Sequence, residues 1–495
     1  MKKIAFLTAD ANYANYLQRN LQNSRISAMI NRNSPEYEKE TVILAQIDLT
    51  TGSIPKTLLR FAFPMICGNL LQQLYNVADT LIVGRFLGSD ALGAVGSSYT
   101  LMTFLTSVII GLSLGTGSFI SMAFGRKEQD SIRNGIFMSA GIIGILTLLI
   151  TAAFYMLTDP IISLLNVPEE LTGDMHTYLV YVFTGFFAVF LYNYISNILR
   201  GMGNSTLPLI FLGVSVALNV GLDLLFVIPL GMGIMGAALA TAIAQYVSGV
   251  GVLVYFIAAY PEFRLTRRDM RWDSRNFRSI LSLSGFTCLQ QSVMNLGILM
   301  VQTVVNSFGS VVMAAFSVAV KIDTIAYMPV QDFGNAFSVF TAQNYGAGKN
   351  ERIRSGIRQS AISVVLFCIA VSAAVCLLAE PLMSAFVDSS SRETIEVGVQ
   401  YLRTEGACYI GIGILFMLYG YYRAVNKPVM SVVLTVFSLG TRVLLANLLS
   451  AVPEIGVFGI WISIPIGWFL ADAVGVGYFI AVERKRLFRN GGGTI

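Results

Sequence analysis

The chain has 495 residues, of which 55% are hydrophobic and 12% are charged, and its mean hydropathy is +0.67. Soluble domains carry about 25% charged residues, so this composition excludes a water-soluble globule and makes lipid the solvent. The formal net charge is only +5, and the basic residues gather in particular loops. This distribution argues against nucleic acid as a partner and for a membrane topology.

Cysteine and histidine give no sign of a cofactor. The five cysteines lie singly inside apolar runs without a CxxC spacing, and the lone His176 has no neighbouring ligand types. Buried free cysteine usually packs as a small hydrophobic residue. We therefore expect no cofactor and no metal centre built from these residues. The cysteines are Cys67, Cys288, Cys368, Cys376 and Cys408.

Residues 1 to about 50 differ from everything that follows. They are polar, rich in Asn and mixed in charge, and they show no stable apolar period. The run IAFLTA is too short for the hydrophobic region of a signal peptide. We predict a cytoplasmic extension of little order.

From Pro55 onward, long apolar runs alternate with short polar breaks. A helix needs about 20 residues to cross about 30 Å of hydrocarbon, and this length predicts about twelve membrane-spanning helices. We place them near residues 57–84, 91–123, 132–157, 175–200, 206–229, 234–260, 277–307, 311–345, 353–379, 395–422, 429–450 and 456–482.

The charges of the breaks test this assignment. Every second break is basic, the others are acidic or neutral, and only Arg85 and Arg392 go against the pattern. The positive-inside rule predicts such alternation for an even number of spans with both termini in the cytoplasm. The basic breaks hold Arg126, Lys127, Arg133, Arg200, Arg264, Arg267, Arg268, Arg271, Arg275, Arg278, Lys349, Arg352, Arg354, Arg423 and Lys427.

The chain also contains an internal repeat. FGRKEQDSIRNGIFMSA (124–140) resembles YGAGKNERIRSGIRQSA (345–361) without a gap, and Gly125 matches Gly346 at an offset of 346 − 125 = 221 residues. Each half holds an even number of spans, so the second copy enters the membrane in the same direction as the first. Secondary transporters use such parallel repeats to build a central cavity.

These features predict an all-α integral membrane protein with two pseudo-symmetric six-helix bundles around a central cleft. We place the boundaries as a polar extension (1–50), an N-terminal lobe (51–262), a basic cytoplasmic linker (263–278), a C-terminal lobe (279–482) and a cytoplasmic tail (483–495).

Several stretches resemble the multidrug and toxic compound extrusion (MATE) family, and the resemblance covers about residue 47 to the C-terminus. It implies export of small organic, amphipathic or cationic compounds across the cell membrane by antiport with Na⁺ or H⁺ through alternating access. The implied partners are small-molecule substrates and membrane lipid, with the protein a monomer. The stretches are PMICGNLLQQLYNVADTLIVGRFLG (64–88), ILRGMGNSTLP (198–208), LNVGLDLLFVIPLGMGIMGAALATAI (218–243) and QNYGAGK (343–349).

The resemblance also implies functional residues. In one branch of the family, an acid on the first helix forms a cation or proton site with an Asn–Asp pair on the fifth helix and a Thr on the sixth. The matching residues here are Asp79, Asn219, Asp223 and Thr241. A proline bend of the first helix matches Pro64, and a glutamine of the cavity matches Gln72.

Two positions depart from the family pattern. The glutamate near the start of the fifth helix is replaced by Met202, and a glutamate that another branch carries on the seventh helix has no counterpart among residues 279–305. The ligand set therefore leaves the choice between Na⁺ and H⁺ open.

The residues support the same site without the family. An ionisable group inside the bilayer is costly and usually functional, and Asn219 and Asp223 share one helix face at a spacing of four. With Asp79 and Thr241 they offer an oxygen-rich site that suits Na⁺, whereas two dehydrated carboxylates close together suit H⁺. The alternative is that these groups only form hydrogen bonds between helices.

The C-terminal half is chemically different. Arg442 lies close to the repeat position of Asn219, and a cation site is implausible beside an arginine. We expect Arg442 and Lys321 to form ion pairs with nearby acids or to bind anionic parts of a substrate. The candidate acids are Asp323, Asp332, Glu405 and Asp472. We assign to the substrate cavity Gln72, Asn76, Asn193, Lys321 and Asp323.

Other functions fit less well. QNYGAGKN lacks the GxxxxGK[ST] spacing of a phosphate loop, and no strand precedes GMGIMGAA, so an ion gradient is the expected energy source. A flippase for lipid-linked glycans would have more helices and a strongly cationic cavity. A membrane receptor or enzyme without transport would need a catalytic pair or a large extramembrane domain. Neither is visible, and we expect no enzymatic activity.

Overall fold

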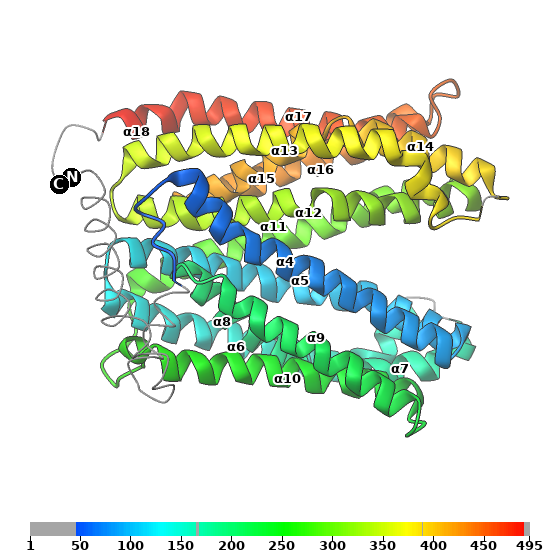
Figure 1. Cartoon of the computed structure of the whole chain (residues 1–495), viewed down its shortest axis with the longest axis horizontal. Helices are drawn as coiled ribbons and strands as arrows, with labels where there is room; N and C mark the ends of the chain where they lie inside the picture. The colour runs from blue at the N-terminus through cyan, green and yellow to red at the C-terminus, as the bar shows by residue number, and fades with distance from the viewer. Residues whose placement is uncertain (1–45, 165–167, 389, 490–495) are drawn as a thin grey trace, which may run out of the picture. The chain divides into compact units, whose positions relative to one another are not determined.

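The structure is a computed structural model that describes residues 46–164, 168–388 and 390–489. The extension expected over residues 1–50 lies almost entirely outside the described residues, and so does the end of the expected tail. The helices belong to one compact unit that begins at Ile47. Its described residues form long helices that run side by side, and no strand occurs among them (Figure 1).

The first half contains seven of these helices. They are α4 (Ile54–Phe86), α5 (Ser89–Gly125), α6 (Gln129–Leu164), α7 (Glu169–Thr184), α8 (Phe186–Gly201), α9 (Thr206–Val227) and α10 (Gly233–Ala259).

The second half repeats this order, and a short 3-10 turn, η1 (Pro261–Phe263), precedes it. Its helices are α11 (Ser274–Asn306), α12 (Ser310–Gly346), α13 (Asn350–Ser384), α14 (Arg392–Gly406), α15 (Tyr409–Ala424), α16 (Pro428–Ser450) and α17 (Phe458–Tyr478). The last span continues beyond residue 482 through a π-helical turn, η2 (Phe479–Glu483), into α18 (Arg484–Arg489).

The twelve expected spans are confirmed. Nine of the described helices are individually long and apolar enough to cross a membrane, and α7 with α8 makes a further span that bends by 44°. Two more polar elements, α4 and the pair α14–α15, fill the positions of the first span of the first half and the fourth span of the second. Each half therefore supplies six spans.

The fourth span differs from the single helix expected over 175–200. It breaks at Gly185, where α7 ends and α8 begins. A Cβ atom at Gly185 would lie 3.0 Å from the Cα of Ala242 on α10, so the break is where two backbones approach closely. The second half breaks at Ala407, between α14 and α15, which is 407 − 185 = 222 residues later.

The two halves meet at a pair of repeat-related glycines. A Cβ atom at Gly125 on α5 would lie 2.0 Å from the carbonyl oxygen of Gln343 on α12, and one at Gly346 would lie 2.1 Å from that of Met122. Since 343 − 122 = 346 − 125 = 221, the two contacts are related by the repeat offset. The structure thus confirms the parallel repeat as a pseudo-two-fold contact.

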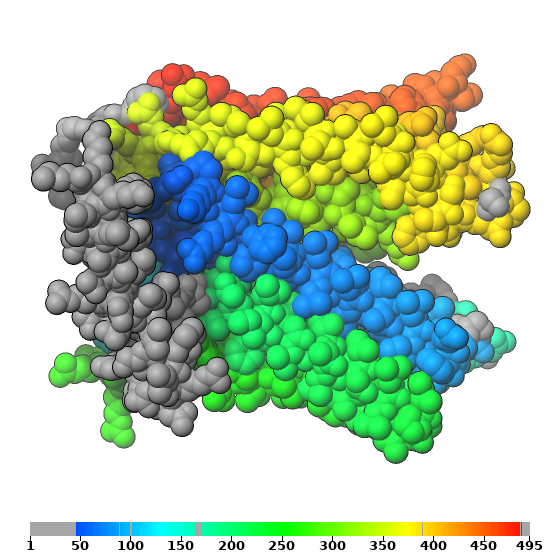
Figure 2. Space-filling model, viewed as in Figure 1, coloured from blue at the N-terminus to red at the C-terminus, as the bar shows by residue number. Residues whose placement is uncertain are grey.

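The first span of each half packs against both halves. Helix α4 packs on α9 of its own half and on α12 of the other, and α11 packs on α16 and on α5. The halves diverge towards the end away from η1, where Figure 2 shows the surface notched between α4 and the C-terminal half. Helix α18 and the segment that leads into α4 lie at the same end of the bundle, as an even number of spans requires (Figure 1).

The segment before α4 joins the halves at the η1 end. The amide of Ile47 donates to Gly203 O at 2.9 Å in the first half. Two residues later, Leu49 is fully buried, and its carbonyl accepts from Asn344 Nδ2 at 3.1 Å in the second half. The guanidinium of Arg352 donates to Gly52 O at 2.8 Å. The chain therefore holds the two halves together here before the first span begins.

Candidate ion and substrate site

Three helices of the first half bring the four predicted ion-site residues together. Asp79 lies on α4, Asn219 and Asp223 on α9, and Thr241 on α10, and all four are buried. Asn219 Nδ2 donates to Thr241 Oγ1 at 3.3 Å. Asp79 and Asp223 are close enough for their charges to interact. The structure thus places the predicted residues in one cluster.

The local sequence explains why these side chains point inward. The buried polar positions of α9 recur every four residues, at Ser215, Asn219 and Asp223, so they form one stripe along the helix. Ser215 Oγ fixes that stripe against the next helix by donating to Ala244 O at 2.9 Å. On α4, Asp79 lies four residues after Tyr75, on the same helix face, and Tyr75 Oη lies 3.2 Å from Thr241 Oγ1.

The cluster contains oxygen atoms that lack hydrogen-bond donors. Asp79 Oδ1, Asn219 Oδ1 and both carboxylate oxygens of Asp223 are buried without a hydrogen-bond partner of good geometry. A buried acceptor left in this way costs about 1–3 kcal/mol. Four such oxygens in one place form a site that a cation or a proton would stabilise.

The donor set fits either coupling ion. Among the described residues no group of three or more His, Cys, Asp or Glu side chains is placed to hold a metal. A bound Na⁺ would therefore depend on the amide and hydroxyl oxygens of Asn219 and Thr241 as well as on the two acids. A proton would need only the carboxylates of Asp79 and Asp223, which suppress each other's ionisation when close together.

Two tyrosines that the sequence analysis did not identify lie near this cluster. Tyr75 Oη lies 3.2 Å from Thr241 Oγ1, and the charges of Asp79 and Asp223 act on both Tyr75 and Tyr178 of α7. The spacing of four between Tyr75 and Asp79 was a signal that could have identified the first of them. No pattern in the sequence pointed to Tyr178.

The residues expected in the substrate cavity are placed differently from one another. Gln72 and Asn76 are half-buried on α4, where Asn76 Nδ2 donates to Gln73 Oε1 at 3.1 Å. Asn193 is half-buried on α8 and donates to Val189 O of its own helix at 2.9 Å. Their assignment to a cavity stays a prediction.

The second half holds a buried cluster of another kind. Asp323 on α12 accepts from Tyr409 Oη at 2.7 Å, and Glu405 on α14 lies beside it. The charge of Arg442 on α16 acts on both acids. No nitrogen of Arg442 comes within 4.0 Å of a carboxylate among the described residues, so this is a longer-range pairing than the ion pair we expected.

The remaining charged residues of the second half lie apart from that cluster. Lys321 is exposed, and in the described part of the chain it makes no ion pair. Asp332 is buried between the halves, where Asn69 Nδ2 donates to its Oδ1 at 2.5 Å and the charge of Arg200 acts on it. Asp472 is buried alone on α17, and both its carboxylate oxygens lack a partner.

Two homologous bundles of membrane-spanning helices, with buried polar clusters inside each, define the class of helical membrane transporters built from parallel repeats. Comparisons with known proteins identify the family. The MatE family model matches residues 64–225 and 287–448, so the same model matches each half in turn. The chain belongs to the MatE family.

Relatives and solved structures agree with this membership. The chain is 30% identical over 392 residues to "Probable multidrug resistance protein YpnP" of Bacillus subtilis, covering 79% of this chain and 87% of the relative. It is 27% identical to "Probable multidrug resistance protein NorM" of Thermotoga maritima, covering 83% and 89%. Its fold matches a solved outward-facing multidrug resistance MATE family transporter with a TM-score of 0.83 at 24% identity, covering 90% and 99%.

Proposed function

We propose that this transporter exports small organic, amphipathic or cationic compounds by antiport with Na⁺ or H⁺. The observation that carries the coupling is the cluster of Asp79, Asn219 and Asp223, whose oxygens are buried together without donors. The names of the relatives, which describe multidrug resistance proteins, support the class of substrate.

Antiport requires that the ion and the substrate stabilise different states of the protein, because a ligand with equal affinity for both states shifts nothing. Asp79 lies on α4, which packs against both halves. An ion that binds Asp79 and Asp223 ties α4 to α9 and thereby favours one arrangement of α4. A substrate that needs the other arrangement is released when the ion binds.

Pro64 gives α4 a place where that arrangement can change. It lies inside α4 and cannot donate a backbone hydrogen bond. Ser205 Oγ donates to Phe61 O at 2.7 Å, three residues before the proline. A hydroxyl from another helix commonly supports the backbone around such a proline. We propose that α4 bends or straightens at Pro64 as the first half changes state.

We further propose that the protein lies in the cell membrane with both termini and the linker between α10 and α11 in the cytoplasm, because the basic breaks gather at that end. The same proposal places the end where the halves diverge outside the cell. A reporter fused after Arg271 should be cytoplasmic and one at residues 160–172 external, and finding both on one side would exclude this topology.

The decisive experiment uses the purified full chain in liposomes that contain a fluorescent cationic dye. We expect dye efflux when a Na⁺ or H⁺ gradient is imposed and none when the gradient is dissipated. In the same assay, Pro64→Ala should slow gradient-driven efflux. Dye efflux at the same rate with and without either gradient would exclude ion-coupled export. Efflux by Pro64→Ala at the wild-type rate would show that the proline has no role in the mechanism.

A further inference from the structure

The connection between the two halves carries a surface that transport does not explain. Residues 264–278 join η1 to the first turns of α11 and include six arginines whose side chains are all exposed. Arg264 Nε donates to Ile257 O at 2.9 Å. The other five make no ion pair with a carboxylate among the described residues. They are Arg267, Arg268, Arg271, Arg275 and Arg278.

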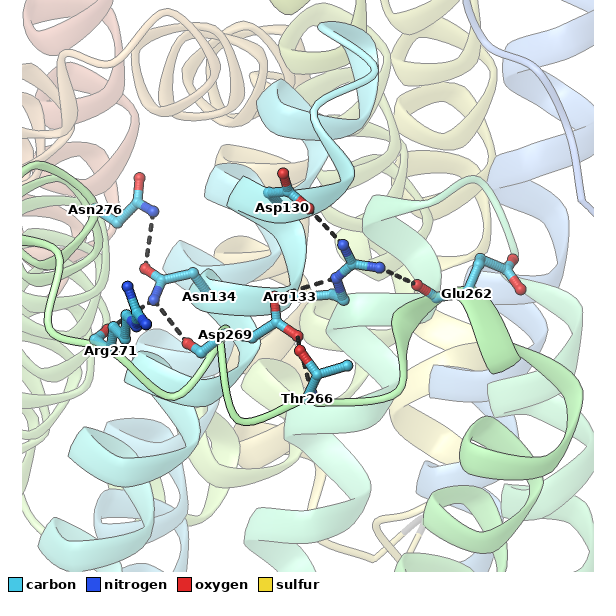
Figure 3. A network of polar contacts seen from close by, with 8 residues as sticks. All are labelled: Asp130, Arg133, Asn134, Glu262, Thr266, Asp269, Arg271 and Asn276. Atoms are coloured by element: carbon cyan, nitrogen blue, oxygen red, sulfur yellow. Dashed lines mark hydrogen bonds and ion pairs between the residues drawn. The ribbon is translucent and has the colours of Figure 1, made fainter.

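The backbone of this connection is held firmly against α6, as Figure 3 shows. Asn134 Nδ2 donates to Asp269 O at 2.9 Å and to Arg271 O at 2.8 Å. Asn276 Nδ2 in turn donates to Asn134 Oδ1 at 2.9 Å. A side chain of the first half thus fixes the middle of the arginine-rich segment and the first turn of α11, so the arginines there project from a defined surface.

The two acids within residues 264–278 are already engaged. Asp269 accepts from Arg133 Nε at 3.2 Å and from Thr266 Oγ1 at 2.5 Å. Burial raises the pKa of Asp269, but these hydrogen bonds and the Arg133 charge outweigh it and hold the pKa below its usual value. Asp273 caps α11 by accepting from the backbone amides of Arg275 and Asn276. The outward face therefore keeps its positive charge.

Large apolar side chains stand among the arginines. Trp272 is 67% exposed, Met270 49% and Leu265 38%. The Trp272 ring centroid lies 4.4 Å from that of Phe277, which holds the indole in place. Tryptophan beside basic residues, directly after a membrane span, is the composition of segments that lie in the headgroup layer.

We propose that residues 264–278 bind the phosphate headgroups of anionic phospholipids in the adjoining leaflet, with Trp272, Met270 and Leu265 inserted between the lipids. The surface holds a cavity of about 680 Å³ whose lining includes Asn134, Arg268, Arg271 and Arg275. Guanidinium groups match phosphate oxygens in geometry as well as in charge. Because Asn134 ties this segment to the first half, bound lipid would anchor that half to the membrane surface.

Trp272 provides the measurement, since the other two tryptophans, Trp461 and Trp468, are buried on α17. The full chain is reconstituted in phosphatidylcholine vesicles with a minor fraction of phosphatidylglycerol, and the quenching bromine is placed on one lipid or the other. The fluorescence of Trp272 is the difference between the emission of the wild type and that of Trp272→Phe. We expect that signal to be quenched more by brominated phosphatidylglycerol, per mole of lipid, and the preference to weaken with salt.

A triple variant tests the arginines. In Arg268→Gln/Arg271→Gln/Arg275→Gln the preference for phosphatidylglycerol should fall at least tenfold, because three basic residues that each contribute a factor of about five before screening together contribute a factor of about 100. The matched variant with lysine at the same three positions should keep most of it. Equal quenching by the two brominated lipids, or an unchanged preference in the glutamine variant, would overturn the proposal.

A soluble anion is the competing source of phosphate, and a separate arm distinguishes it. Wild-type protein in lipid-free neutral detergent is titrated with inorganic phosphate or with a short-chain phosphatidylglycerol while Trp272 emission is followed. A blue shift with the lipid and none with phosphate supports the assignment. A saturating response to inorganic phosphate alone would assign the surface to a soluble anion and overturn it.

Discussion

The buried acids of the two halves differ in what surrounds them. In the first half, Asp79 and Asp223 share their cluster with an amide and a hydroxyl group, and no ion pair to either acid occurs among the described residues. In the second half, Asp323 and Glu405 lie within range of Arg442 and beside Tyr409. The first cluster lacks a positive charge, and the second already contains one.

The repeat shows how this difference arises. At the offset of 223 residues that holds for the later spans, Asn219 corresponds to Arg442 (442 − 219) and Asp223 to Ala446 (446 − 223). Ala446 is fully buried, so the second half fills with a methyl group the place where the first half keeps a carboxylate. One fold therefore holds a cluster of unpartnered oxygens in one copy, where we propose the ion site, and in the other copy a cluster on which an arginine acts.

This contrast assigns different tasks to the halves. A cluster that needs an outside cation or proton to satisfy its oxygens is sensitive to the ion gradient, because its stability depends on that ion. A cluster compensated by its own guanidinium is not. We therefore expect coupling to depend on the first half and structural integrity to depend more on the charges of the second.

The largest expected effect follows for the first-half acids. In Asp79→Asn and Asp223→Asn, gradient-driven efflux in liposomes should fall to the rate seen without a gradient, because the neutral amide removes the charge that binds the ion and keeps its shape. Substrate affinity measured without a gradient should change less than about tenfold, since the ion acts on the equilibrium between states.

Asp472→Asn is the matched control for these variants, because Asp472 is also a buried carboxylate with two unpartnered oxygens but has no second acid beside it. It should retain gradient-driven efflux. Full efflux in both Asp79→Asn and Asp223→Asn would break the comparison and move the coupling site to the second half, where Asp323 and Asp332 are the next candidates.

Much of the fold, and the residues that form the buried polar cluster of the first half, were predictable from the sequence. Hydropathy and loop charge are properties of whole segments, so they predicted the spans without any detail of packing, and the ungapped match of residues 124–140 to 345–361 predicted the repeat. Asp79 and Asp223 were indicated by the cost of burying ionisable groups, Asn219 was added by its spacing of four from Asp223, and the family resemblance implied the same set.

Other features depend on contacts that composition does not contain. The break at Gly185 reflects how closely α8 approaches α10. The sequence is apolar on both sides of this glycine, so hydropathy does not indicate the break. The ion pairs expected for Lys321 are absent among the described residues because the side chain is exposed and lies away from the buried acids, which depends on the rotation of α12 and not on composition. Tyr178 on α7 is buried within the range of the charges of Asp79 and Asp223, and that position depends on tertiary packing alone.

A second, smaller effect is expected at Arg442. Replacing it with glutamine removes the positive charge that acts on the buried Asp323 and Glu405. Arg442 is only half-buried and forms no close ion pair with either acid, so we expect a smaller loss than the figure of about 3–5 kcal/mol that is typical of breaking a buried ion pair. Thermal unfolding of the purified protein in detergent should show a clear loss of stability in Arg442→Gln.

The second change Glu405→Gln should restore part of that loss, because it removes one of the two uncompensated acids. The double variant isolates the interaction between the two side chains. If Arg442→Gln were as stable as the wild type, or if Glu405→Gln failed to improve it, the second half would not be internally compensated and its contrast with the first would disappear.

The smallest expected effect is one in which the halves should behave alike. Gly125 and Gly346 are repeat partners whose added Cβ atoms would lie 2.0 and 2.1 Å from carbonyl oxygens of Gln343 and Met122. Such overlap forces α5 and α12 apart at the η1 end, and overpacking of this kind costs about 1–3 kcal/mol. Gly125→Ala and Gly346→Ala should therefore lower the thermal stability by similar amounts. Because both variants separate the same two helices, the double variant should cost less than the sum of the two single losses.

The controls for these variants are Gly96→Ala on α5 and Gly440→Ala on α16, where an added Cβ meets nothing within 4 Å and alanine favours the helix. Unequal losses of thermal stability in the two variants would contradict the prediction. They would show that the pseudo-two-fold contact is asymmetric and that the halves differ in more than their buried acids.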